Sequence, residues 1–120
     1  DMKTLLEKQA TEPHAAQAIE LFCYTARKHI GALSATIGGI DSLVFTGGIG
    51  ERAAPVRWMI CHGLDYLGIG LDPGKNDAHE DIISMENSPC TVRVIHTNED
   101  LMIARHTRDL LFGERQGEVQ

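Results

Sequence analysis

The sequence lacks the features that mark several classes of protein. Only 5% of its 120 residues are aromatic, and its three cysteines form no Cys-x-x-Cys pair and lie near no His-x-x-x-His ladder. A disulfide framework or a zinc site is therefore not expected. We expect the cysteines to be free thiols in a reducing, cytoplasmic compartment. No run of eighteen apolar residues is long enough to cross a membrane, and no basic start leads into an apolar stretch.

Positive charge is also scarce. Lysine and arginine total 11 against 17 aspartates and glutamates, which gives a net charge of -6. Such a field repels phosphate backbones and anionic lipids, so neither nucleic acid nor a membrane is an expected partner. Hydrophobic residues make up 42% of the chain, close to the globular average, and the length suits one domain. We therefore expect a single compact α/β domain.

The hydrophobic pattern predicts alternating helices and strands. Apolar residues at helical spacing predict a long helix over 11–37, with Thr11 as N-cap and Gly38 at its end. Leu43, Val44 and Phe45 predict a strand buried on both faces, as in a parallel or mixed sheet. The apolar stripe of the long helix comprises Ala15, Ile19, Phe22, Ala26, Ile30, Leu33 and Ile37. The elements expected after the strand are a helix over 53–67, a short strand at 69–71, a loop over 72–89 with one possible strand at 82–83, a strand over 91–95 and a helix from 97.

A glycine-rich segment, Gly47-Gly48-Ile49-Gly50, lies between the predicted strand and the helix that follows it. Glycines there let the phosphates or ribose of a ligand approach the backbone, although they also serve simply to turn the chain. A dinucleotide-binding Rossmann module is a further alternative, because residues 48–53 satisfy G-x-G-x-x-A and Asp72 follows the next predicted strand. The long preceding helix and the very short second strand count against it.

Several blocks of sequence together resemble one known family. These blocks are Phe22-Cys23-Tyr24, Ile30-Gly31-Ala32, residues 43–51, residues 63–69 and residues 97–104. In this order and at this spacing they resemble the acetate kinase family, which belongs with the sugar kinases and actin. The resemblance implies the C-terminal part of a ribonuclease H-like (actin-like ATPase) domain, with a mixed sheet flanked by helices. Residues 1–113 would form this domain, and residues 114–120 a polar tail.

The resemblance also implies a reaction, partners and a cofactor. Family members transfer the γ-phosphoryl group of ATP to acetate, reversibly, which gives acetyl phosphate and ADP, and they use Mg²⁺. The family's catalytic aspartate, arginines, histidine and acetate pocket all lie upstream of the matched region. We therefore expect this chain to depend on the remainder of a kinase chain, to be inactive alone, and to form a homodimer in the complete enzyme. A non-catalytic remnant of a kinase is the alternative.

Two stretches of this chain match nucleotide-binding positions of the family. Asp1-Met2-Lys3 resembles an Asp-x-Arg nucleotide contact, with Lys3 in place of the arginine. Gly48, Ile49, Gly50 and Glu51 match the loop along the adenosine, and Arg52 stands where asparagine is common.

Glu99 aligns with the glutamate that the family associates with magnesium, although a carboxylate at a helix start also stabilises the helix dipole. His79-Glu80-Asp81 is expected to be a solvated loop without a role. Arg105 and Arg108 are expected to form surface ion pairs.

Overall fold

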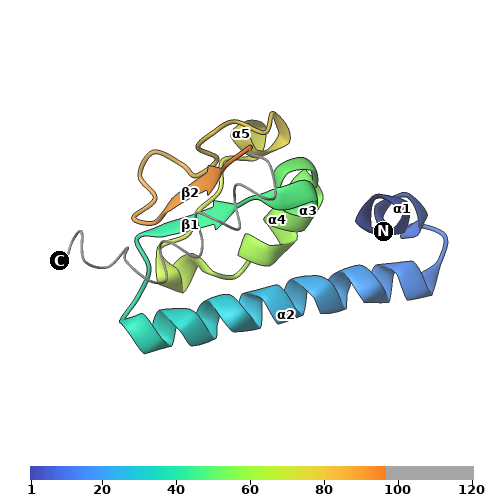
Figure 1. Ribbon diagram of the computed structural model, residues 1–120, viewed down its shortest axis with the longest axis horizontal. Helices are drawn as coiled ribbons and strands as arrows, with labels where there is room; N and C mark the ends of the chain where they lie inside the picture. The colour runs from blue at the N-terminus through green and yellow to red at the C-terminus, as the bar shows by residue number, and fades with distance from the viewer. Residues whose placement is uncertain (97–120) are drawn as a thin grey trace.

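The computed structural model describes residues 1–96, and Figure 1 shows the arrangement of their elements. Its elements in chain order are α1 (Met2–Lys8), α2 (Pro13–Ile37), β1 (Ser42–Phe45), α3 (Gly47–Arg52), α4 (Ala54–Cys61), the 3₁₀ helix η1 (Asp65–Leu67), α5 (Pro73–Asp77) and β2 (Thr91–Val94). Within residues 1–96, no helix is both long and apolar enough to cross a membrane.

Helix α2 confirms the predicted long helix but differs in its start and in its buried face. Pro13 occupies the first turn and Glu12 is the N-cap, so the prediction for Thr11 was wrong. The helix ends at Gly38, whose φ of 84° suits a residue without a Cβ atom. Phe22, Leu33 and Ile37 were predicted to lie on the buried stripe, but they are 40%, 64% and 68% exposed. Periodicity identifies a helical face, but it does not show how far along the helix other elements contact that face.

The strands β1 and β2 pair in parallel, as the apolar run had indicated. Leu43 lies opposite Val92, and Phe45 opposite Val94. The prediction that β1 is buried on both faces was wrong, because Val44 is 42% exposed while its two neighbours pack on the core. The strands expected at 69–71 and 82–83 are reduced to isolated bridges, which join Leu71 to Ser84 and Ile82 to Arg93.

The helix predicted over 53–67 is broken into pieces. Pro55 lies in the first turn of α4, where its missing N–H costs nothing, and it starts a new helix after α3. Gly63, with φ of 87°, follows the end of α4, and η1 ends at Gly68. The expected loop at 72–77 is helix α5 instead, because the Asp72 carboxylate accepts a hydrogen bond from the Lys75 N–H at 3.0 Å and caps it.

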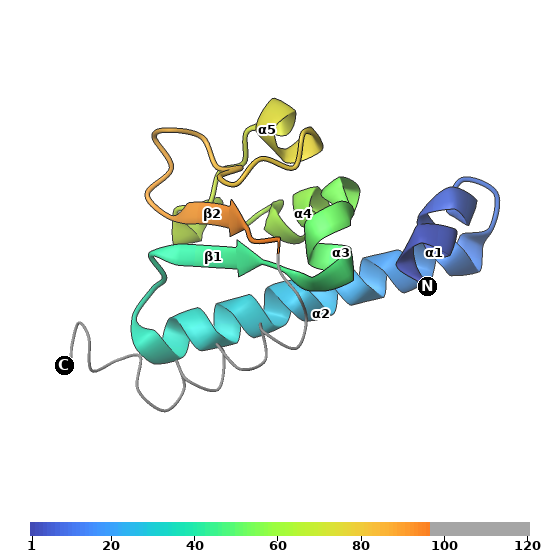
Figure 2. The same ribbon diagram turned by 45° about the horizontal axis from the view of Figure 1, so that its top comes forward.

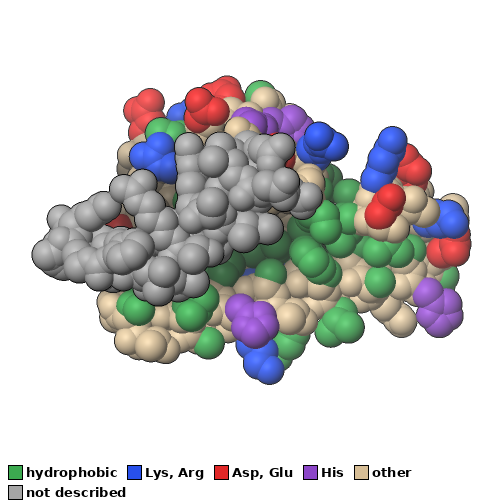
Figure 3. All heavy atoms as spheres, viewed as in Figure 1, with side chains coloured by type: hydrophobic (Ala, Val, Ile, Leu, Met, Phe, Trp, Pro, Cys, Tyr) green, Lys and Arg blue, Asp and Glu red, His purple; other side chains and the backbone are tan. Residues whose placement is uncertain are grey.

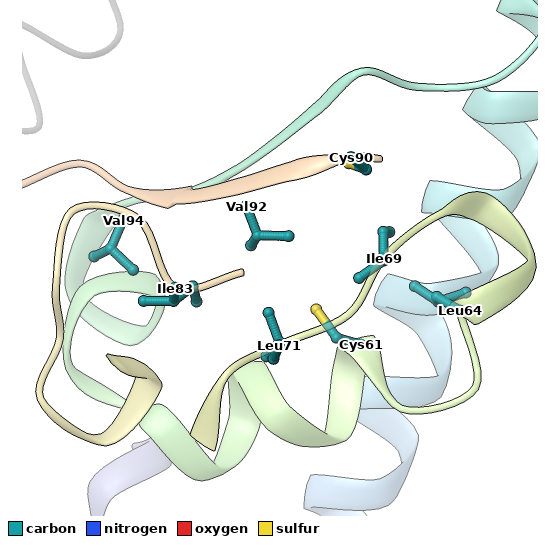
Figure 4. Close-up of a cluster of buried hydrophobic side chains, with 8 residues drawn as sticks. All are labelled: Cys61, Leu64, Ile69, Leu71, Ile83, Cys90, Val92 and Val94. Atoms are coloured by element: carbon teal, nitrogen blue, oxygen red, sulfur yellow. The ribbon is translucent and has the colours of Figure 1, made fainter. Parts of the chain in front are cut away.

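Two hydrophobic clusters hold these elements together. The first joins β2 to α4 and to the chain that follows α4, and Figure 4 shows its buried side chains pointing toward one another. The second cluster lies between α1, α2 and α4 and consists of Met2, Ile19, Cys23, Ala53, Val56 and Ile60. This second cluster fixes α1 on the same side of α2 as α3, as Figures 1 and 2 show.

Candidate functional site

The glycine-rich segment is a short helix rather than the loop that was expected. Thr46 precedes α3 with an extended backbone, and its hydroxyl donates a hydrogen bond to the Ile95 carbonyl at 2.9 Å. The backbone N–H of Gly47 donates to the Glu51 carboxylate at 3.0 Å. The end of β1 and the start of α3 are therefore fixed by side-chain contacts.

The three glycines of α3 serve different purposes. Gly47 has φ of 76°, which a residue with a side chain adopts only with strain. A Cβ atom on Gly50 would lie 3.2 Å from the Phe45 carbonyl carbon, so this glycine allows α3 to pack closely on the end of β1. A Cβ atom on Gly48 would meet no atom within 4 Å. The space beside Gly47 is equally open, but of the three glycines only Gly48 lines the pocket between α1 and α3.

A pocket of about 560 Å³ lies between α1 and α3. Figure 3 shows hydrophobic side chains on the surface between these two helices, with charged side chains around them. The pocket is lined by Asp1, Met2, Lys3, Leu6, Glu7, Gly48, Ile49, Arg52 and Ala53. Its volume and its mixture of apolar and charged groups are typical of a site for a small organic ligand. The two stretches assigned from sequence to nucleotide binding therefore line one pocket, although more than forty positions separate them.

The residues of α1 contribute to this pocket in different ways. The Asp1 carboxylate accepts a hydrogen bond from the Thr4 N–H at 2.9 Å and so caps α1. Met2 is 8% exposed and belongs to the second hydrophobic cluster, so it anchors the helix. Lys3 is exposed and carries a cation at the pocket. Lys3 is therefore the residue of the three whose charge is available to an anionic ligand.

Glu51 and Gly50 do not line this pocket, although both were predicted to contact the nucleotide. The Glu51 side chain is 13% exposed and points back to Gly47, and it also lies 3.4 Å from the Nδ1 atom of His96. Arg52 does line the pocket and is exposed. These positions indicate that Glu51 and Gly50 hold α3 in shape, and that Arg52 can reach a ligand.

Arg57 is a buried cation that the sequence analysis missed. It is 0% exposed, and its guanidinium donates to the Gly50 carbonyl at 2.9 Å and to the Asn76 side-chain oxygen at 2.7 Å. It also contacts the Asn76 carbonyl at 2.6 Å and His79 Nδ1 at 2.8 Å. Burial lowers the pKa of Arg57, and the nearby Asp77 carboxylate raises it. Arg57 stands four residues after Ala53 and three before Ile60, both buried, so its place on this apolar stripe was the available signal in the sequence.

His79 was expected to lie in a solvated loop and to have no role, but the structure places it against Arg57. It is half-buried, accepts from Arg57, and has a φ of 54°, which is unusual for a residue with a side chain. Asp72 caps α5 as described and does not line the pocket that contains Gly48, so its position does not support the ribose ligand of a Rossmann module.

The described residues contain no group of three or more His, Cys, Asp or Glu side chains that could hold a metal ion. Glu99, the residue assigned to magnesium from sequence, lies outside residues 1–96, and so do Arg105, Arg108, the helix expected from 97 and the polar tail.

Comparisons with known proteins agree on one family. A family model described as the acetokinase family matches residues 1–105. The chain is 46% identical over 117 residues to an acetate kinase of Rhodopseudomonas palustris, a match that covers 96% of this chain and 29% of that protein. It is 44% identical over 115 residues to an acetate kinase of Coprothermobacter proteolyticus, covering 94% and 29%.

Solved structures give the same result. The crystal structure of the Porphyromonas gingivalis acetate kinase matches with a TM-score of 0.78 and 33% identity over 92% of this chain and 29% of that one. A propionate kinase of Francisella tularensis matches with a TM-score of 0.77 and 40% identity, covering 88% and 27%. The chain thus spans less than a third of the length of these relatives.

Proposed function

Because this chain belongs to the acetokinase family, we propose that it supplies the adenosine side of the nucleotide site in an ATP-dependent acetate kinase. The observation that carries the proposal is the pocket between α1 and α3. Lys3 from one stretch and Gly48, Ile49 and Arg52 from the other line it together. The sequence resemblance assigned both stretches to the nucleotide independently of any structure.

The chemistry of this pocket suits an adenine nucleotide. The apolar side chains of Met2, Leu6 and Ile49 can pack on the faces of a purine. Gly48 presents backbone without a side chain, so a ribose can approach closely. Lys3 and Arg52 supply cations that attract the phosphates or stack on the base. The pocket would therefore orient the nucleotide and exclude water from its base.

The proposed reaction is transfer of the γ-phosphoryl group of ATP to the carboxylate of acetate, which gives acetyl phosphate and ADP. Such transfer depends on positioning and electrostatic stabilisation from several sides of the phosphates. Since the chain spans 29% of its acetate kinase relatives, we propose that the rest of a kinase chain supplies the groups opposite this pocket. The 120 residues alone are expected to bind nucleotide weakly and to form no acetyl phosphate.

Glu99 is proposed as the residue of this chain that holds magnesium. Magnesium keeps most of its water shell and takes one or two carboxylates besides the substrate phosphates, so one glutamate fits this pattern. When bound, the ion neutralises charge on the transferring phosphate. Glu99 would hold the ion against the phosphates of the nucleotide.

The proposed setting is a cytoplasmic homodimer with a ribonuclease H-like domain. The parallel pairing of β1 with β2 supports the proposed fold. Three free and buried cysteines suit a reducing compartment. Exposed apolar side chains on α2 leave surface that further protein can cover. Leu21, Leu33 and Ile37 are 65%, 64% and 68% exposed.

A hybrid enzyme tests the proposal. In this hybrid kinase, the chain replaces the matched segment of the Rhodopseudomonas palustris acetate kinase, to which it is 46% identical. We expect the hybrid kinase to form acetyl phosphate from ATP and acetate. A hybrid kinase that folds, as judged by circular dichroism and melting, but forms no acetyl phosphate would instead favour a non-catalytic remnant.

A further inference from the structure

A series of polar contacts connects the start of helix α3 to its last turn. At the start, the Gly47 N–H donates to Glu51, whose second oxygen lies 3.4 Å from His96 Nδ1. The other ring nitrogen of His96 lies 3.4 Å from the His79 carbonyl. His79 Nδ1 contacts the Arg57 guanidinium at 2.8 Å.

Arg57 closes this circuit at the other end of α3. Its Nη1 atom donates to the Gly50 carbonyl at 2.9 Å. A carbonyl in the last turn of a helix lacks the usual partner four residues ahead, so an outside donor is needed when that end is buried. The guanidinium supplies that donor and ties α3 to Asn76 of α5 through two more hydrogen bonds. Asn76 in turn donates to the Ala54 carbonyl at 3.0 Å, at the start of α4.

The burial of Arg57 needs an explanation beyond stability. Among residues 1–96, no carboxylate lies within salt-bridge distance of it, although that of Asp77 is nearby, and its four hydrogen-bond acceptors are two backbone carbonyls, the Asn76 side-chain oxygen and a His79 ring nitrogen. A buried charge is costly even when it is hydrogen-bonded, and a hydrophobic side chain of similar volume often stabilises a core at least as well. What the guanidinium provides, and an apolar side chain cannot, is a rigid planar fork that fixes several acceptors at once.

We propose that Arg57 is a positioning residue of the nucleotide pocket. It does not line the pocket between α1 and α3. It holds the Gly50 carbonyl, and through it the orientation of the short helix whose Gly48, Ile49 and Arg52 face the ligand. His79, which has an unusual positive φ, accepts a hydrogen bond through Nδ1 from the same Nη2 atom of the guanidinium that donates to the Asn76 carbonyl. This inference rests on the proposed function, because it assigns the pocket to the nucleotide.

The hybrid kinase allows the test, with Arg57→Lys as the main variant. Lysine keeps the charge, but a single ammonium cannot satisfy acceptors on opposite sides of a planar fork. Arg27→Lys is the matched control. Arg27 also donates from Nη1 to a backbone carbonyl, that of Met59 at 2.6 Å, and it does not line the pocket. The readouts are KM for ATP, KM for acetate and the melting temperature of each variant.

We expect Arg57→Lys to raise KM for ATP about tenfold, the effect of losing one hydrogen bond to a charged group, and to change KM for acetate less than about twofold. Arg27→Lys should lower the melting temperature without changing KM for ATP. The milder variant His79→Asn, which tolerates the positive φ but is too short to reach Arg57, should raise KM for ATP a few-fold. His79→Asn decides the matter if Arg57→Lys does not fold.

The proposal is overturned if Arg57→Lys leaves KM for ATP unchanged, as Arg27→Lys should, or if it raises KM for ATP and KM for acetate equally. If Arg57→Lys does not fold, an unchanged KM for ATP in His79→Asn overturns the proposal. Gly48→Leu in the same enzyme separates this failure from failure of the proposed function. If Gly48→Leu raises KM for ATP and Arg57→Lys does not, the pocket binds nucleotide and only the positioning role is wrong. If Gly48→Leu also has no effect, the assignment of the pocket is wrong, and the positioning role fails with it.

Discussion

Gly48 should favour ligand binding while it lowers the stability of helix α3. Substitutions at this position should therefore change nucleotide binding and stability in opposite directions. Gly48 is the second residue of α3 and has no positive φ, and a Cβ atom placed on it meets nothing within 4 Å. Alanine in a helix is more stable than glycine by up to about 1 kcal/mol. Gly48→Ala should therefore raise the melting temperature of the 120-residue chain by about 2–5 °C. Gly48→Leu should also raise the melting temperature, slightly less than Gly48→Ala does, since leucine ranks just below alanine as a helix former.

Nucleotide binding should change in the opposite direction to stability. A leucine at position 48 projects into the pocket, so we expect KM for ATP in the hybrid kinase to rise about tenfold or more. KM for acetate should change much less. Steady-state rates at varied ATP and saturating acetate, then the reverse, measure both values.

Gly50→Ala is the matched control for this experiment. Its Cβ atom would lie 3.2 Å from the Phe45 carbonyl carbon, and such overpacking costs about 1–3 kcal/mol. Gly50→Ala should therefore lower the melting temperature, with a smaller effect on KM for ATP. If Gly48→Leu folds normally and leaves KM for ATP unchanged, or if Gly48→Ala destabilises the chain as much as Gly50→Ala, the division of roles between these glycines is wrong.

Three further predictions concern charge, metal and pH. Lys3→Gln in the hybrid kinase should raise KM for ATP several-fold, whereas Lys3→Arg should not, and equal kinetics for both variants would remove Lys3 from the site. Glu99→Gln should lower turnover and shift the magnesium dependence of the rate to higher concentration at saturating ATP. If the variant folds and its rate depends on magnesium as in the unsubstituted enzyme, Glu99 has only a helix-end role. Burial raises the pKa of Cys61 from 9.0 to about 12, so the folded state should lose stability as the pH rises from about 9 toward 12. Melting temperatures at pH 8, 10 and 11 measure this loss, and Cys61→Ala should reduce it; equal curves would contradict the assignment.

The sequence predicted the elements with the strongest periodicity. The helix ending at Gly38 and the parallel strands at 42–45 and 91–94 are confirmed, because a long apolar repeat and short apolar runs bounded by turn residues are local signals. The helix predicted from residue 53 starts where α4 does, but its end at Cys61 and the helical form of residues 47–52 were missed. Asp72 was seen as a turn residue or ribose ligand, but its carboxylate caps a helix of five residues, too short to show periodicity.

The candidate site was predictable only in part. The resemblance identified both stretches that line the pocket, but not which residues within them face it. Close packing of Gly50 on Phe45 and the inward turn of Glu51 depend on how α3 meets the sheet, which no local pattern encodes. Arg57 was missed because its partners Asn76 and His79 lie about twenty residues away in the chain.

The central claim is that an adenine nucleotide binds between α1 and α3, and amide chemical shifts of the 120-residue chain test it most directly. NMR detects weak binding, so ADP and NAD can each be titrated to millimolar concentration into ¹⁵N-labelled chain. The account predicts that ADP shifts the amides of Lys3, Gly48, Ile49 and Arg52 most strongly. Largest shifts elsewhere, for example at the pocket lined by Lys75 and Arg93, or a folded chain with no shifts at all, would contradict it.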